Sequence, residues 1–439
     1  MTIARKQLLL GAASAAGMLL PTYVAAQTLV PSATVTAGGG YSSNPFLGRG
    51  SGDNGGSATT EVSVSPRLDI IDDTDSGSIS AFYNRTDYLS NYSGNDGYGV
   101  SIGANSQLSP RTSIGFSAGY NSSILGAANA FVGVPVIVPT PVVGTGGTGT
   151  VDTGTGTGTG TGTVAPGGGV VPLPTTPIID PGDIGGDIGL IGLRQRRNSL
   201  TASVYGSYRP SEVSTWTFGG NVSRNSYPSN GGLATNSRTY GVNTGYSRSL
   251  SAVSSIGIQV SATVVDYAIV PDSRFVAPQL TYSRRLAQFW SLNLAAGVSL
   301  VDDGFSTNVA PSGSVSLCRS GERDIFCFTA ARQPSVSAFG GARNQTSVSA
   351  SYSYRLAERT TLSAGANYSR SSNGITGTTI GNSRSQDYLS ATGTVNQQLT
   401  RRLSGYASVS YRDVKGLGLP TDPDLGARVG LALQVGGRR

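Results

Sequence analysis

The chain has 439 residues, a formal net charge of +7, and charged residues at 13% of the total, against about 25% in ordinary soluble domains. It contains no His and only two Cys, which excludes Ser-His-Asp triads, Cys-His pairs, HExxH helices and closed zinc sites. Its basic residues are scattered and form no basic-aromatic cluster, so nucleic-acid binding is disfavoured. We expect a non-enzymatic protein with no cofactor and no metal.

Residues 1–26 have the features of a secretory signal peptide. Arg5 and Lys6 precede an apolar run over residues 8–20, and the small residues Ala25 and Ala26 precede Gln27. A membrane anchor is the alternative, but the apolar run is shorter than the roughly 18 to 20 residues that a spanning helix needs. We predict cleavage near Ala26 and a single mature domain over residues 27–439.

Apolar and polar residues then alternate in many short segments. In residues 61–70, Val62 and Val64 point to one side while Glu61 and Arg67 point to the other, which is the period of a β-strand with two unlike faces. Eighteen such segments follow in chain order, near residues 33–41, 61–71, 78–88, 98–104, 114–120, 200–204, 216–222, 240–246, 256–260, 276–282, 292–298, 315–317, 326–328, 348–356, 362–368, 389–395, 407–411 and 429–435. The pattern predicts about eighteen strands and an all-β fold.

The alternation stops between the fifth and sixth segments. Residues 123–196 are rich in Gly, Thr, Pro and Val, with a Gly-Thr repeat over residues 153–163, and such a composition cannot bury a core. We predict one long low-complexity loop, extracellular if the strands form a barrel. Its apolar parts, residues 131–143 and 170–179, are expected to fold into the barrel mouth. A loop that stays wholly outside as a disordered tether is the open alternative.

Short and long connections alternate along the chain, as in the hairpin over residues 346–369, whose turn is at 357–359. Tight turns at one end and long loops at the other are typical of an up-and-down antiparallel transmembrane β-barrel. Aromatic residues support this by lying near the strand ends: Tyr208, Trp216, Tyr246, Tyr282, Trp290 and Tyr354 near short turns, and Tyr41, Tyr120, Tyr368 and Tyr411 near long loops. A secreted β-sandwich is the alternative, but its outer face should carry Lys, Glu and Arg rather than Ser, Thr, Gly and Asn.

The polar side of the predicted strands supplies the candidate site residues. Ser, Thr, Gly and Asn dominate it, and the charged residues expected to line the lumen are Glu61, Arg67, Asp69, Arg355, Arg412 and Arg428. Such a wall suits polar solutes, although it can equally be a hydrated wall without a specific role. Cys318 and Cys327 flank a short polar turn on this same side. In an oxidising compartment we predict a disulfide between them, with a free buried pair as the alternative.

Two stretches carry a resemblance to a known family. The string YSSNPF at residues 41–46, followed by EVSVSPRL at residues 61–68, resembles proteobacterial outer-membrane β-barrel porins of the type associated with exopolysaccharide secretion. The resemblance implies an outer-membrane barrel that serves polymer export. The chain departs from the pattern in its Gly-Thr insertion and in its end, LQVGGRR at residues 433–439, which lacks the terminal aromatic common in substrates of the barrel-assembly machinery.

The sequence therefore predicts a passive pore for small polar solutes in the Gram-negative outer membrane. The alternative is a non-catalytic accessory or scaffold protein of exopolysaccharide export, or a cell-surface interaction element. The expected partners are outer-membrane lipid, lipopolysaccharide and the barrel-assembly machinery, and polysaccharide-export components under the alternative. The sequence does not predict an oligomeric state.

Overall fold

The computed structural model describes residues 28–47, 55–72, 74–124, 188, 191, 194–228, 234–304, 306–371, 385–416 and 422–437. The predicted signal peptide and almost all of the predicted 123–196 loop lie outside these residues, including both of the apolar parts expected to fold inward. In the part of the chain that the structure describes, no helix is long and apolar enough to cross a membrane.

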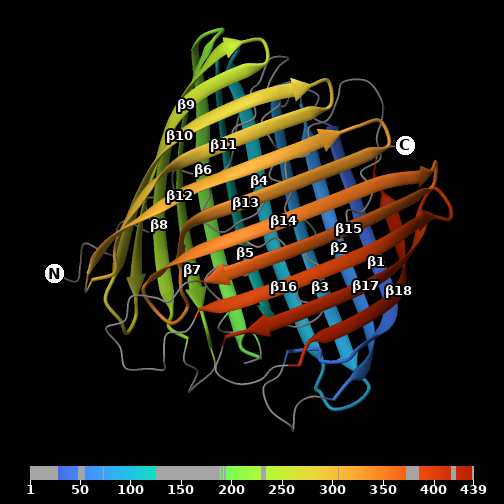
Figure 1. The fold of residues 1–439 in the computed structure, drawn as a ribbon. Helices are drawn as coiled ribbons and strands as arrows, with labels where there is room; N and C mark the ends of the chain where they lie inside the picture. Colours follow the sequence, from blue (N-terminus) through green and yellow to red (C-terminus); the bar gives the residue numbers. More distant parts are fainter. Residues whose placement is uncertain are drawn as a thin grey trace.

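In the described part of the chain, eighteen strands follow one another and wrap into one closed wall (Figure 1). The strands are β1 (Thr28–Ser42), β2 (Ser57–Ile71), β3 (Asp75–Tyr88), β4 (Asn95–Ser109), β5 (Thr112–Ile124), β6 (Arg196–Ser211), β7 (Ser214–Ser226), β8 (Ser237–Ser251), β9 (Ser254–Tyr267), β10 (Ser273–Ala287), β11 (Trp290–Asp302), β12 (Thr307–Ser320), β13 (Asp324–Val336), β14 (Ala342–Ala357), β15 (Thr360–Ser371), β16 (Gln386–Gln398), β17 (Leu403–Lys415) and β18 (Asp424–Gly436). The predicted number is confirmed. β5 and β6 extend slightly into the predicted loop, to Ile124 and from Arg196.

Each strand pairs antiparallel with the next one along the chain, and β1 also pairs with β18. In that last pairing Ala33 lies opposite Val435 and Tyr41 lies opposite Ala427. The sheet therefore closes on itself and every strand has a neighbour on both sides, although β12 and β13 pair only over residues 313–320 of β12. The predicted up-and-down antiparallel barrel is confirmed.

The two ends of the barrel differ. At one end all connections are short, two to four residues long, such as 110–111 and 358–359. At the other end their lengths vary widely, from the short connection 303–306 to the very long connection 125–195. We call these the short-turn end and the long-loop end. β1 begins and β18 finishes at the short-turn end, because an even number of alternating strands returns the chain to its starting side.

The strands have one apolar and one polar face, and the in-register pairing keeps each face continuous around the barrel. On β2, Val62 and Val64 are 50% and 38% exposed, whereas Ser63 between them is 9% exposed. The apolar face carries the exposed Val, Leu, Ile and aromatic side chains. Aromatic residues lie on this face near both strand ends, and some touch across strands, as Trp216 and Tyr246 do with ring centroids 4.9 Å apart.

Candidate functional site

The polar face is a layer of small hydroxyl, amide and glycine positions. Because these residues occupy alternate positions on paired strands, their side chains lie directly opposite each other and form hydrogen bonds across the ladder. Ser80 and Ser101 are 2.6 Å apart through their hydroxyl oxygens. The Gln345 amide donates to the Ser369 hydroxyl at 2.7 Å. The face is thus hydrophilic over most of its area, but at the long-loop end Val265, Phe275 and Val301 form an apolar patch on it.

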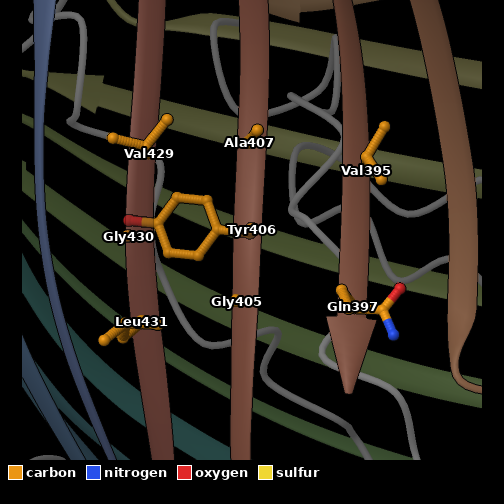
Figure 2. A pocket seen from close by; sticks show the side chains of 8 residues that line it. All are labelled: Val395, Gln397, Gly405, Tyr406, Ala407, Val429, Gly430 and Leu431. Carbon is orange, nitrogen blue, oxygen red and sulfur yellow. The ribbon is translucent and has the colours of Figure 1, made fainter. Parts of the chain in front are cut away.

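Aromatic side chains on the polar face lie flat over glycines. A Cβ atom at Gly115 would be 2.3 Å from the Tyr205 ring, and a Cβ atom at Gly430 would be 2.5 Å from the Tyr406 hydroxyl oxygen. Figure 2 shows the Tyr406 side chain reaching from β17 to Gly430 on β18. Because only glycine leaves room for the rings, they follow the wall instead of standing out from it.

The Tyr406 hydroxyl reaches beyond Gly430 and across β1. It donates a hydrogen bond to Glu61 Oε1 on β2 at 2.6 Å, while Arg428 Nη1 lies 4.0 Å from Glu61 Oε2. Glycine at position 38 of β1 makes the crossing feasible, since a Cβ atom there would be 2.8 Å from the hydroxyl oxygen. This group ties β17 to β2, across the two strands that close the barrel.

A buried ion pair holds the chain after β1 against the polar face. Arg412 Nη2 lies 2.6 Å from Asp424 Oδ2, and these side chains are only 4% and 1% exposed. The Asn44 backbone amide donates to Asp424 Oδ1 at 2.9 Å, and Arg412 donates to the Pro45 carbonyl at 2.9 Å. Both charges are therefore paired and hydrogen-bonded, as buried charges must be. Residues 43–47 lie over β17 and β18 as a result.

Apolar side chains gather beyond this ion pair at the long-loop end. We call the following residues the mouth cluster: Phe46, Leu47, Tyr88, Ile188, Ile191, Arg194, Tyr388 and Val414. Leu47 and Ile188 are 1% and 0% exposed. The Arg194 guanidinium lies over the Phe46 ring at 4.4 Å and donates to the Ser93 hydroxyl at 3.2 Å. Two long-loop connections thus pack together against strand ends.

All six predicted lumen-lining residues lie on the polar face, but they do not form one site. Glu61 faces Arg428, and Arg412 pairs with Asp424. Arg67 and Asp69 form a separate ion pair at 2.7 Å. Arg355 is exposed near a short turn. Sequence reasoning missed Asp424, Tyr406 and Asn44. Only Tyr406 could have been noticed in the sequence, because it occupies a polar-face position of a strand whose other polar-face residues, such as Ser404 and Ser408, are small.

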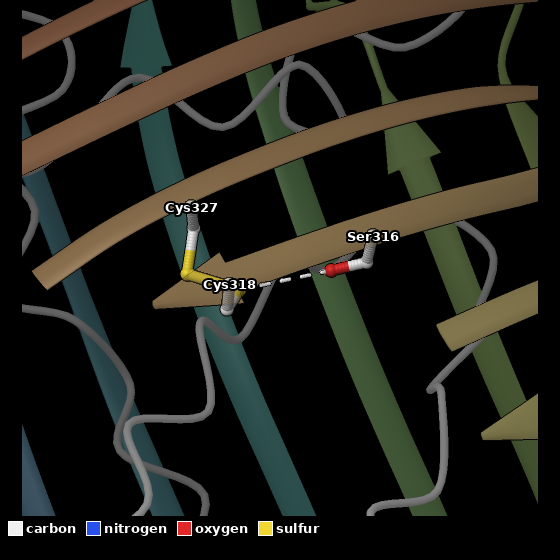
Figure 3. The surroundings of a disulfide bond; sticks show 3 residues. All are labelled: Ser316, Cys318 and Cys327. Carbon is white, nitrogen blue, oxygen red and sulfur yellow. Dashed lines mark hydrogen bonds between the residues drawn. A yellow bond between two sulfur atoms is a disulfide. The ribbon is translucent and has the colours of Figure 1, made fainter. Parts of the chain in front are cut away.

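The predicted disulfide is present. Cys318 on β12 and Cys327 on β13 lie directly opposite each other with Cα atoms 4.2 Å apart, and Figure 3 shows the bond joining the two strands beside Ser316. Both residues are on the polar face, since Leu317 and Phe328, which alternate with them, are on the apolar one.

Removing this disulfide should destabilise the barrel without preventing its assembly. The bond closes a loop with a sequence separation of 9 residues, for which the entropic model gives about 2 to 3 kcal/mol. We expect Cys318→Ser to lower the free energy of unfolding in urea by that amount. Reduction of the wild type should produce the same shift, and reduction of Cys318→Ser should produce none. Mass spectrometry that finds two free thiols in protein matured in the periplasm would contradict the disulfide itself.

A depression on the apolar face lies over Gly405 (Figure 2). It is lined by apolar side chains and one amide: Val395, Gln397, Ala407, Val429 and Leu431. Tyr406 is the one ionisable residue that borders it, and its hydroxyl is engaged with Glu61 on β2. Among the described residues no three His, Cys, Asp or Glu side chains are grouped so that they could hold a metal ion. The polar face and the mouth cluster are therefore the candidate functional site.

No protein family and no curated protein sequence matches the chain. Solved structures with a similar chain course include a BenF-like porin from Pseudomonas fluorescens Pf-5, with 10% identity over 93% of this chain and 98% of that one and a TM-score of 0.43. OccK2 (OpdF) from Pseudomonas aeruginosa, in complex with glucuronate, has 9% identity, the same coverages and a TM-score of 0.43. The siderophore receptor PirA from Pseudomonas aeruginosa has 12% identity, coverages of 93% and 80%, and a TM-score of 0.40. At these values the assignment of function rests on the geometry of this chain alone.

Proposed function

We propose that the chain forms a barrel in the Gram-negative outer membrane and acts as a passive pore for small polar solutes. One observation carries the proposal: a closed barrel of eighteen strands has an exposed apolar face and, opposite it, a largely polar face. Barrels of sixteen to eighteen strands leave an aqueous channel inside. Lipid is the solvent that matches the apolar face, so the polar face lines the lumen.

The aromatic residues mark the two membrane interfaces, and the lengths of the connections give the orientation. Rings near both ends of the apolar face match the two girdles that transmembrane barrels place at the membrane interfaces. Short turns and both chain termini are periplasmic in such barrels, and the longer loops are extracellular. The mouth cluster would then lie at the extracellular opening.

The wall chemistry favours uncharged or weakly charged solutes. Hydroxyls and amides can exchange hydrogen bonds with a polar solute as water does. The charged groups Glu61 with Arg428, Arg412 with Asp424, and Arg67 with Asp69 neutralise one another. Arg355 adds a positive charge outside these pairs, so the wall keeps only a modest positive field. Residues 43–47 and the mouth cluster would narrow the opening and set a size limit.

Conductance of the refolded protein in planar lipid bilayers tests the pore. We expect stepwise single-channel currents with a modest preference for Cl⁻ over K⁺, because most of these wall charges are paired and Arg355 adds a positive one. Uptake of uncharged sugars into liposomes that contain the protein should fall as the sugar grows. Folding is verified beforehand by circular dichroism and by the altered gel mobility of the unheated protein.

Silence in both assays after verified folding would refute the pore and favour a scaffold. The dense packing of Phe46, Leu47, Ile188 and Ile191 is the observation that keeps this second function open, because a mouth filled by the protein's own loops does not conduct. An accessory role in exopolysaccharide export is supported only by the resemblance of residues 41–46 and 61–68 to that type of porin.

A further inference from the structure

Two arginines stand on the apolar face at the short-turn end, on either side of β9. Arg248 on β8 lies opposite Ile256, and Arg284 on β10 lies opposite Ser254. Ile256 and Ser254 are two residues apart on the same face of β9. Two strand spacings and the two-residue offset separate the arginine backbones by about 12 Å. Both side chains are exposed and long enough to converge on one small group between them.

These arginines lack the carboxylates that accompany the arginines at the other end of the same strands. At the long-loop end, Arg238 on β8 lies opposite Asp266, and Arg274 on β10 lies opposite Asp302. Arg248 and Arg284 have only Ser, Ile and Leu residues opposite them. Neither takes part in an ion pair with a described residue. Their positive charge is therefore available to an anion from outside the chain.

The surroundings of the pair define the kind of anion. Tyr246 and Tyr282 lie two residues from Arg248 and Arg284 on the same strands and the same face, towards the middle of the barrel wall. Tyrosine rings favour the boundary between headgroups and acyl chains. The arginines, one step closer to the turns, then stand at the level of lipid phosphates, which guanidinium groups bind through paired N–H donors.

We propose that Arg248 and Arg284 form a binding site for the phosphate of an anionic phospholipid, of the phosphatidylglycerol type, in the periplasmic leaflet. Ser254 stands on the same face of β9, opposite Arg284, with its hydroxyl hydrogen-bonded to that of Ser251 at 2.7 Å. The exposed Ile256 and Ile258 side chains offer apolar surface to an acyl chain. The inference rests on the proposed membrane location, and it adds a specific lipid partner at the end of the barrel away from the mouth cluster.

Quenching of tryptophan fluorescence by brominated lipids tests the site. The chain has two Trp residues, and both lie at the short-turn end on the strands that flank β8 and β10: Trp216 near the start of β7 and Trp290 at the start of β11. The protein is reconstituted in mixtures of phosphatidylcholine with brominated phosphatidylglycerol, and in the reverse mixture. About 1 kcal/mol for each arginine near an anionic headgroup corresponds to roughly fivefold in relative affinity. We expect the wild type to prefer phosphatidylglycerol, and Arg248→Gln/Arg284→Gln to lose most of that preference.

The chain supplies a matched control. Arg238→Gln/Arg274→Gln removes the same charge from the same two strands and the same face, but at the long-loop end, and should keep the wild-type preference. Equal preference in both double variants would overturn the site. Quenching by brominated phosphatidylcholine reports insertion irrespective of headgroup. Its absence would refute the membrane location itself, so failure of the site and failure of the proposed function give different results.

Discussion

Arg412→Ala should lower the free energy of unfolding by about 3 to 5 kcal/mol, the range for breaking a buried ion pair from one side. Arg412 and Asp424 are 4% and 1% exposed, so the variant leaves a buried carboxylate without its countercharge. It also removes the donor to the Pro45 carbonyl. We therefore expect residues 43–47 to lose their fixed position on the polar face, and proteolysis after Phe46 to accelerate. Urea titration of the refolded protein in micelles measures the first effect.

Two further variants isolate the cause. Arg412→Ala/Asp424→Ala should be less destabilised than Arg412→Ala alone, because the double variant no longer buries an unpaired charge. Arg370→Ala breaks an exposed pair with Asp387, whose N–O distance is 3.7 Å, and should cost less than about 1 kcal/mol. If Arg412→Ala and Arg370→Ala were equally stable, the ion pair would not be what holds residues 43–47.

Phe46→Ala/Leu47→Ala should raise the single-channel conductance and admit larger sugars. Both side chains are 1% exposed, so the variant removes buried packing worth roughly 2 to 5 kcal/mol for each residue. That loss is large enough to free the short segment from the mouth cluster. Because a constriction dominates the resistance of a wide channel, its loosening changes conductance more than a change elsewhere on the wall.

The control for this variant removes similar side chains from the apolar face close by. Tyr41 and Leu425 are 53% and 61% exposed, and Tyr41→Ala/Leu425→Ala should leave conductance at the wild-type value. A wild-type conductance in Phe46→Ala/Leu47→Ala, with folding verified, would mean that the mouth cluster lies beside the path of the solute rather than across it.

The fold could be predicted from the sequence because one face of each strand is mostly apolar and the other is mostly polar. Alternation such as Val62, Ser63 and Val64 then marks each strand, and the alternation of short turns with long loops orders the strands into hairpins. Local pattern also placed Cys318 opposite Cys327, since only a short turn separates them. None of these inferences required knowledge of residues distant in the chain.

The candidate site could not be predicted in the same way. Glu61 and Tyr406 are 345 residues apart, and Asn44 and Asp424 are 380 apart, so their contacts follow from barrel closure and from no local pattern. Asp424 stands at the start of its strand beside Asp422, where it resembles an ordinary loop carboxylate. Residues 43–47 lie over the polar face because the buried Asp424 carboxylate binds the Asn44 amide and Arg412. The 123–196 loop and its predicted inward folding stay predictions.

The Tyr406 bridge bears on the order in which the barrel assembles. The β1–β18 pairing joins the two ends of the chain, whereas every other pairing joins neighbours, and contacts of long sequence separation form late because their loop-closure entropy is large. The ring of Tyr406 can reach Glu61 only after β1 and β18 lie side by side with Gly38 and Gly430 beneath it. The bridge is thus absent from any unsealed intermediate, and its stabilisation acts mainly by slowing the reopening of the finished barrel.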